Sequence, residues 1–215
     1  MQLEFIGLDH VRHGSHKKLV PTVGRLTGQK PALKLKEVWS IRARLEISNS
    51  VRDLALFNMA IDSKLRGCDL VRLRVGDVAA GGEINSRGTV VQKKTGRPVR
   101  FEITETTRRA VAALIEDGGV GGEDYLFKSR LTKSQHLSTR QYARIAQGWV
   151  SSIGLNPAAY GTHSLRRTKA AQIYRTTGNL RAVQLLLGHT KLDSTVRYLG
   201  VEVDDALAIS EAVDM

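Results

Sequence analysis

Cysteine is almost absent from this sequence, because Cys68 is the only one among 215 residues. A single thiol cannot form a disulfide within the chain, and it excludes a zinc site built from several cysteines. This usage fits a reducing compartment, so we expect a cytoplasmic protein. His10, His13 and His16 are spaced three apart, but no helical pattern supports them and no thiolate lies nearby. We therefore expect no metal site and no cofactor.

Long hydrophobic stretches are also lacking. No stretch approaches the roughly 18 apolar residues that a membrane-spanning helix needs. The opening residues, MQLEFIGLDHVRH, have an apolar run too short and too interrupted for a signal peptide. The sequence therefore predicts a soluble intracellular protein with no membrane partner.

Negative charge is scarce over most of the chain. The sequence has 33 Lys and Arg against 21 Asp and Glu, a net charge of +12 and a pI of about 10.1. The last residues, Leu199 to Met215, contain five acids and no base, so the rest of the chain is more basic still. Such a balance favours a polyanionic partner, and nucleic acid is the simplest candidate.

The hydrophobic pattern predicts an α+β domain that is mainly α-helical. Helical patterns begin near residues 32, 51, 105 and 138, and the second is expected to end with Arg66 and a Gly67 C-cap. Val90-Val91 and Val99-Arg100-Phe101 flank a turn that contains Gly96, which predicts a β-hairpin. Residues 1–31 are basic and rich in glycine, as is typical of an arm or lead-in.

The stretch from Gly161 to Tyr198 combines phosphate-seeking side chains with a hydroxyl. With Thr162 as the N-cap, His163, Arg166 and Arg167 fall near the start of a helix, where cations are unfavourable unless an anion joins them. His163 and Arg166 share a helix face, so both can reach the same phosphate oxygens. The pattern indicates an anion site at this helix end.

A second imidazole and the hydroxyl follow. Leu180–Leu187 predicts a buried helix closed by Gly188, which directs His189 out of the turn. Asp193 is a good N-cap for a short helix that carries Tyr198. Taken alone, His189 fits a polar residue after a cap, and Tyr198 fits the edge of a core. Taken together, they favour a phosphate site with a tyrosine nucleophile.

These motifs resemble those of a known family. HSLRRT, LLLGHT and Tyr198, at these intervals, resemble the carboxy-terminal signature of the tyrosine recombinase (phage integrase) family. LRGCDLVRLRVGDV resembles the family's first-arginine motif, with Arg66 at the catalytic arginine and Asp69 at the supporting acid. KTG is similar to the family's hairpin lysine element. Only one of Lys93 and Lys94 can face the site, and although the strand pleat cannot say which, the KTG match favours Lys94.

The resemblance implies a site-specific DNA recombinase or integrase that cleaves and rejoins strands through a 3′-phosphotyrosine intermediate, without metal or ATP. It also implies a homotetramer on double-stranded DNA, a monomer or weak oligomer when free, accessory DNA-bending proteins, and a nucleoid-associated location. The implied catalytic residues are Tyr198 (nucleophile), Arg66, Arg166, His163, His189 and Lys94, with Asp69 in support and Lys93, Arg97 and Arg167 on DNA.

The resemblance covers about Lys36 to Val201, so we expect the catalytic domain over residues 32–201. Only residues 1–31 precede it, which resembles either short family members that lack the N-terminal core-binding domain or a catalytic fragment. The acidic residues 202–215 are expected to form either a helix that docks on a neighbouring subunit or a frayed terminus. Two other functions remain open: a type IB topoisomerase that relaxes DNA, and a DNA-binding regulator with idle catalytic residues.

Overall fold

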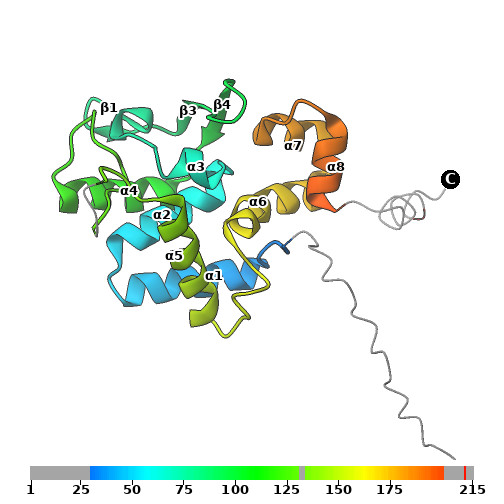
Figure 1. The fold of residues 1–215 in the computed structure, drawn as a ribbon, viewed down its shortest axis with the longest axis horizontal. Helices are drawn as coiled ribbons and strands as arrows, with labels where there is room; N and C mark the ends of the chain where they lie inside the picture. Colours follow the sequence, from blue (N-terminus) through cyan, green and yellow to red (C-terminus); the bar gives the residue numbers. More distant parts are fainter. Residues whose placement is uncertain (1–29, 131–133, 201–210, 212–215) are drawn as a thin grey trace, which may run out of the picture.

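The computed structural model describes residues 30–130, 134–200 and 211. The three spaced histidines, the basic lead-in up to residue 29 and the expected docking helix in the tail lie outside the described residues. Within them, no helix is both long and apolar enough to span a membrane. The fold is mainly helical with two short antiparallel hairpins, which confirms the α+β prediction (Figure 1).

The elements follow one another along the chain with short connections. The helices are α1 (Leu35–Ile47), α2 (Val51–Ser63), α3 (Gly67–Leu70), α4 (Glu105–Gly118), α5 (Thr139–Ser152), α6 (Thr162–Thr177), α7 (Leu180–Leu187) and α8 (Leu192–Leu199), with a 3-10 turn η1 (Val75–Asp77). The strands are β1 (Ala79–Ala80), β2 (Glu83–Ile84), β3 (Arg87–Val91) and β4 (Pro98–Glu102).

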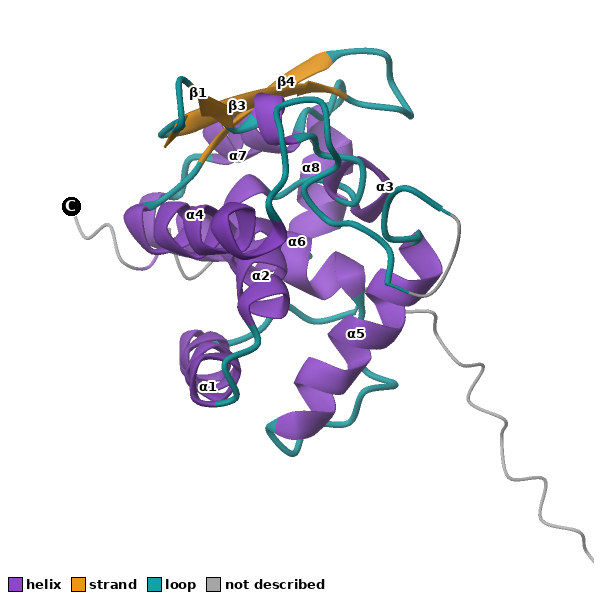
Figure 2. Cartoon of the chain, turned by 90° about the vertical axis from the view of Figure 1, so that its left-hand side faces the viewer, coloured by secondary structure: helices purple, strands orange, loops and turns teal. Residues whose placement is uncertain are grey.

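Helix α2 is the centre of the main core. Its residues Ala55–Ser63 are all buried, and it packs against α1, α4 and α6. A helix that is apolar on several faces needs neighbours on several sides, as its sequence predicted. The strands lie at one end of the molecule and the pair α1 and α5 at the other (Figure 2).

The β3–β4 hairpin forms one wall of the region where the motifs meet. Val90 pairs with Val99 across it, as expected, and Val99 and Phe101 are buried. Gly88 lies beneath the Phe101 ring, where an added Cβ would come within 2.5 Å of the ring. Only glycine therefore allows this strand to lie so close to the aromatic ring.

A second, smaller core joins α6, α7 and α8. Ala170, Val183 and Leu187 are buried in it, and the rings of Tyr174 and Tyr198 pack against them. These helices lie side by side next to the strand end of the main core (Figure 1). The ring of Tyr198, the candidate nucleophile, is thus held by apolar contacts within this smaller core.

Several predicted helix ends were wrong. Helix α2 ends at Ser63, and the left-handed C-cap is Lys64, at φ 53°, in place of Gly67. The reason is a tertiary contact, since this backbone turn lets the buried Lys64 Nζ reach both carboxylate oxygens of Glu102, at 2.7 and 2.8 Å. Arg66 therefore does not end α2, but directly precedes α3.

Two N-caps also differ from those expected. Gly161 is the N-cap of α6, and Thr162 is its first residue. Lys191 is the N-cap of α8, and Asp193 lies within the first turn, where its carboxylate still suits the helix dipole. Helix α5 does begin with the expected capping box, because Ser138 Oγ accepts a hydrogen bond from the backbone N–H of Gln141 at 3.1 Å.

Candidate active site

Side chains from four separate parts of the chain line one open pocket of about 300 Å³. The segments are the start of α3, the hairpin turn, the start of α6, and the stretch from the end of α7 through α8. All six residues that the sequence predicted as catalytic lie in it. The lining residues are Arg66, Lys94, Thr95, His163, Arg166, Gly188, His189, Thr190, Ser194 and Tyr198.

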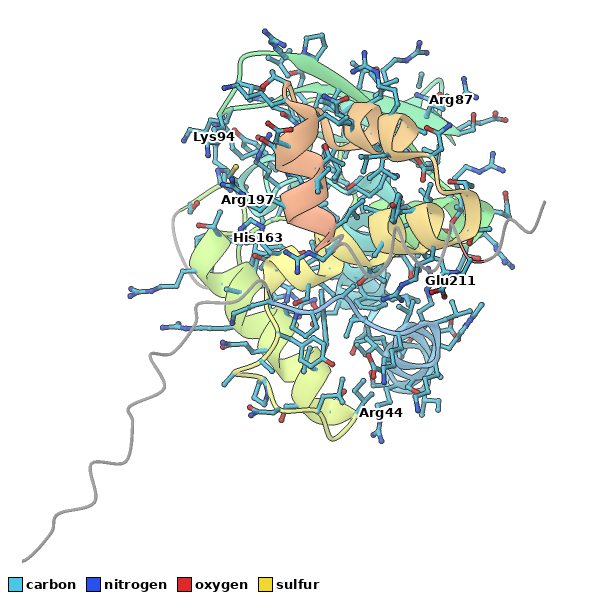
Figure 3. The ribbon with its side chains drawn as sticks, turned by 90° about the vertical axis from the view of Figure 1, so that its right-hand side faces the viewer. Arg44, Arg87, Lys94, His163, Arg197 and Glu211 are labelled. Atoms are coloured by element: carbon cyan, nitrogen blue, oxygen red, sulfur yellow. The ribbon has the colours of Figure 1, made fainter. Side chains whose placement is uncertain are left out.

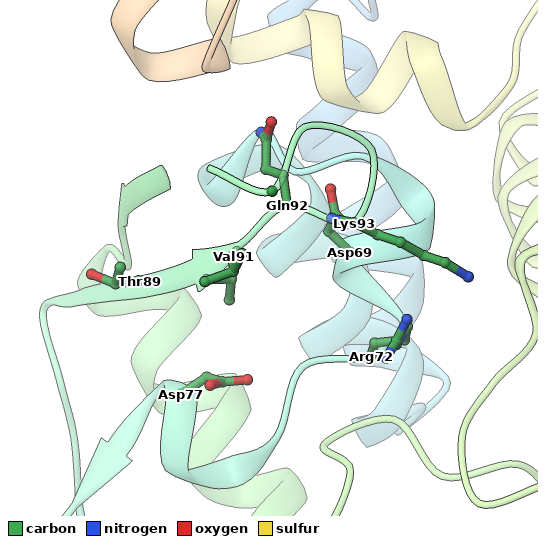
Figure 4. A pocket seen from close by; sticks show the side chains of 9 residues that line it. Asp69, Arg72, Asp77, Thr89, Val91, Gln92 and Lys93 are labelled. Carbon is green, nitrogen blue, oxygen red and sulfur yellow. The ribbon is translucent and has the colours of Figure 1, made fainter. Parts of the chain in front are cut away.

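The hairpin turn divides this pocket from a neighbouring one. Lys94 lines the pocket with the other predicted residues, whereas Lys93 lines the second pocket beside Asp69. Figure 3 shows Lys94 and His163 on the same side of the molecule, and Figure 4 shows Gln92 and Lys93 leaving the turn in different directions. The structure thus places Lys94, and not Lys93, among the predicted catalytic side chains.

Helix α3 fixes the position of that turn. Asp69, 6% exposed, accepts a hydrogen bond from the backbone N–H of Lys93 at 2.9 Å. Asp69 does not line the pocket of Arg66 and Lys94. Its contact therefore fits the supporting role that the sequence predicted, since it ties the lysine-bearing turn to the helix that follows Arg66.

Arg166 is deeply buried on α6. It is 3% exposed, and its Nη2 donates to the carbonyl oxygen of Leu187 at 2.8 Å. Its Nε is buried without a hydrogen-bond partner among the described residues. The guanidinium also lines the pocket beside Tyr198, and its positive charge suits it to receive an anion there.

Arg167 lies in a different place from the one expected. It is 7% exposed, its Nη1 donates to the carbonyl oxygen of Lys30, and its guanidinium carbon lies 4.8 Å from the centre of the Tyr198 ring. The guanidinium carbon of Arg166 lies 5.7 Å from the centre of the same ring, so both arginines approach Tyr198. Arg167 is therefore buried against the Tyr198 ring. Lys93 and Arg97, the other two residues predicted to contact DNA, are exposed.

The turn after α7 presents His189. Gly188 closes the helix at φ 65°, as predicted, and an added Cβ would come within 2.5 Å of Val99 Cγ2. His189 Nδ1 lies 3.1 Å from the hydroxyl of the buried Thr195. Burial, together with the positive charges of Arg166 and Arg66, lowers the pKa of His189 to about 4.

His163 is subject to the same field. Burial lowers the pKa of His163 below its usual value, and the neighbouring cations, Arg166 foremost, lower it further. Both imidazoles are therefore neutral near pH 7, and each can donate one N–H while its other nitrogen accepts a proton.

Tyr198 contacts both His163 and His189. Its hydroxyl donates to the backbone carbonyl of His163 at 3.4 Å, and its ring meets that of His189 edge-on, with centroids 5.3 Å apart. Burial raises the pKa of the phenol, although Arg166, Arg167 and Arg66 oppose the shift. The phenol is thus protonated at rest, and attack on phosphorus requires its proton to leave.

A mainly helical domain that gathers a tyrosine, two arginines, a lysine and two histidines in one pocket defines a class of phosphoryl-transfer proteins. Residues 31–204 match the model of the Phage integrase family. The chain belongs to that family, and its fold is the catalytic domain of tyrosine recombinases.

Particular relatives support this membership. The chain is 28% identical over 178 residues to a probable integrase/recombinase, YoeC, of Bacillus subtilis, and the match covers 83% of this chain and 93% of YoeC. The XerA recombinase structure superposes with a TM-score of 0.70 at 19% identity, covering 88% of this chain and 66% of XerA. The structure of the XerH recombinase bound to its difH substrate superposes with a TM-score of 0.66 at 19% sequence identity, and the match covers 85% of this chain and 52% of XerH. The chain spans about half the length of the curated XerC relatives it matches.

Sequence reasoning missed two residues that contact the predicted set. Gln92 accepts from Arg66 Nη1, and Thr195 contacts His189. Gln92 and Lys94 both lie beyond Val91, the last residue of β3, so strand alternation does not apply to them and gave no signal for Gln92. Thr195 precedes Tyr198 by three residues on a helix, so it shares that residue's face.

Proposed function

We propose that this chain is a site-specific DNA recombinase that cleaves and rejoins DNA strands through a 3′-phosphotyrosine on Tyr198. The observation that carries the proposal is the single pocket lined by Arg66, Lys94, His163, Arg166, His189 and Tyr198. These side chains supply a nucleophile, proton carriers and donors for an anion in one place.

The reaction follows from the chemistry of those groups. The Tyr198 oxygen attacks the scissile phosphorus and forms the phosphotyrosine bond, while the bond to the 5′ oxygen breaks. Lys94 gives a proton to that leaving oxygen, and His163 assists in removing the phenolic proton. Arg66 and Arg166 hold the non-bridging oxygens, on which charge builds in the transition state, and His189 adds a hydrogen bond.

The phosphotyrosine keeps the energy of the phosphodiester, so the reverse attack by a 5′ hydroxyl rejoins DNA without ATP. Double-stranded DNA as the partner is supported by the net charge of +12 and by the similarity to the XerH site-specific recombinase, whose structure holds its palindromic difH substrate. Exchange between two sites needs more than one active site, so we propose a homotetramer on DNA, with DNA-bending accessory proteins assisting it.

A nicked DNA substrate whose cleaved fragment diffuses away tests the proposal. Parent protein in EDTA and without ATP is expected to form a protein–DNA adduct that survives denaturant. Tyr198→Phe is expected to form none while its DNA affinity changes less than about threefold, because only a hydroxyl is lost. Tyr174→Phe is the matched control, since Tyr174 packs in the same small core but does not line the pocket.

Each result discriminates between functions. If the parent protein forms no adduct, the alternative of a DNA-binding regulator with idle catalytic residues is favoured. If Tyr198→Phe still forms an adduct, Tyr198 is not the nucleophile. Recombinant joints between two labelled sites are expected from a recombinase. Relaxation of supercoils without joints would indicate the topoisomerase alternative.

A further inference from the structure

Gln92 is a buried amide at the entry to the hairpin turn, and it contacts three other parts of the site. It is 1% exposed. Its backbone N–H donates to Arg97 O at 2.9 Å and its backbone carbonyl accepts from Gly96 at 2.8 Å, so the backbone at this position is fixed. A side chain that starts from so constrained a backbone has a well-defined reach.

The contacts determine which way the amide faces. Arginine has donors only, so the atom that meets Arg66 Nη1 must be the amide oxygen of Gln92. The hydroxyl of Thr95, in the lysine-bearing turn, donates to the same oxygen at 3.0 Å. The amide nitrogen is then left facing the carbonyl oxygen of Leu187, at 3.5 Å. Donors and acceptors match in this orientation and would clash in the flipped one.

The carbonyl of Leu187 links the two arginines. It accepts from Arg166 Nη2 at 2.8 Å, and Gln92 approaches the same oxygen while its own oxygen holds Arg66. The fit around this point is tight, because a Cβ on Gly188 would come within 3.0 Å of Gln92 Nε2. Gln92 thus connects Arg66, the turn of Lys94, and the end of α7 that precedes His189.

We propose that Gln92 is a positioning residue that sets the direction of the Arg66 fork for the scissile phosphate, an inference that rests on the proposed function. One N–H of Arg66 is held by Gln92, and the remaining donors of the planar guanidinium are left for an anion in the pocket that Arg66 lines. The amide is a neutral acceptor, so it orients Arg66 without cancelling the positive charge that the phosphate needs. A carboxylate in this place would compete with the phosphate for the same guanidinium.

Gln92→Leu tests the proposal, because it keeps a side chain of similar size and removes all three contacts of the amide. The cleavage rate at saturating nicked DNA is expected to fall on the order of 10- to 100-fold, as for a catalytic group misplaced by a fraction of an ångström to an ångström. DNA affinity is expected to change less than about threefold, because a disoriented arginine affects the transition state more than binding.

Gln184→Leu is the matched control. Gln184 is also a buried glutamine, 3% exposed, and it also accepts from an arginine, but its partner Arg181 lies outside the pocket. This variant is expected to cleave at nearly the parent rate. If both variants lose the same factor, loss of a buried amide explains the effect and the proposal is wrong.

A double-mutant cycle shows whether Gln92 acts through Arg66. In an Arg66→Lys background the fork is already gone, so Gln92→Leu is expected to cost less than about threefold there. An equal loss in both backgrounds would overturn the proposal, as would a Gln92→Leu rate within threefold of the parent. Failure of the parent to form any adduct rejects the proposed function instead, so the two failures are distinguishable.

Discussion

At the scale of single residues, the site is an excess of positive charge that lowers the basicity of its own imidazoles. Burial lowers the pKa of His189, and the positive charges of Arg166 and Arg66 lower it further, so the ring is neutral near pH 7. A neutral imidazole carries one N–H, which suits the hydrogen bond that we propose His189 donates to the phosphate. The contact of His189 Nδ1 with Thr195 leaves Nε2 for that work.

The pKa of His189 gives a pH dependence that can be measured. Its folded value of about 4 lies below the ordinary value of 6.5, so the unfolded chain binds the proton first. The free energy of unfolding is therefore expected to fall as pH decreases from about 6.5 toward 4. NMR of the free protein is expected to show the ring titrating near pH 4, and His189→Gln is expected to flatten this part of the stability curve. A ring that titrates near 6.5 in the folded protein contradicts the description of the site.

Among the elements, a partly buried ion network fixes α6 relative to α2 and β4. Lys169 lies three residues after Arg166 on α6, and its Nζ contacts Asp62 at 2.8 Å and Glu102 at 2.9 Å. Lys64 pairs with the same Glu102 from the end of α2. Although burial opposes it, hydrogen bonds from Lys169, Thr104 and Thr107 hold the pKa of Asp62 below its usual value. The network sets the distance between the arginine helix and the hairpin that carries Lys94.

Removing one charge from this network is expected to destabilise the fold. Asp62 is 2% exposed, and Asp62→Asn leaves Lys169 without one of its partners, at a cost of about 3 kcal/mol in urea unfolding. Because the pKa of Asp62 is lowered, its contribution is present above about pH 4 and is lost as pH falls below that value. Asp53→Asn is the control on the same helix, since its pair with Arg52 is partly exposed and is worth less than about 1 kcal/mol. Equal losses for the two variants would contradict the role of the network.

The elements themselves could be predicted where the signal was local. The helix of His163 and Arg166, the Gly188 cap and the hairpin about Gly96 all follow from spacing within a few residues. The end of α2 could not, because Lys64 turns toward Glu102, which is 38 residues away. Gln92 was missed for the same reason, since its contact with Leu187 spans 95 residues. Motifs thus predicted which side chains line the pocket, and tertiary contacts determine what holds them in place.

At the scale of the whole molecule, the net charge of +12 predicts binding that depends on salt. Each phosphate contacted by Lys or Arg releases counterions, so the logarithm of the DNA affinity is expected to fall linearly with the logarithm of salt concentration, by about 0.9 per contact. Arg97→Ala, at the exposed hairpin, is expected to reduce this slope by about 1. Arg44 lies at the opposite end of the molecule from Lys94, so Arg44→Ala is expected to leave the slope unchanged (Figure 3). A slope that Arg97→Ala does not alter would place the DNA elsewhere.

In the proposed reaction, one phenolic oxygen carries the DNA. The most direct measurement is to trap the adduct on nicked DNA, digest it with nuclease and protease, and locate the remaining nucleotide by mass spectrometry of the peptides. We expect the added mass on Tyr198, joined through a 3′ phosphate. A nucleotide on any other residue, or one joined through its 5′ phosphate, would contradict the proposed reaction.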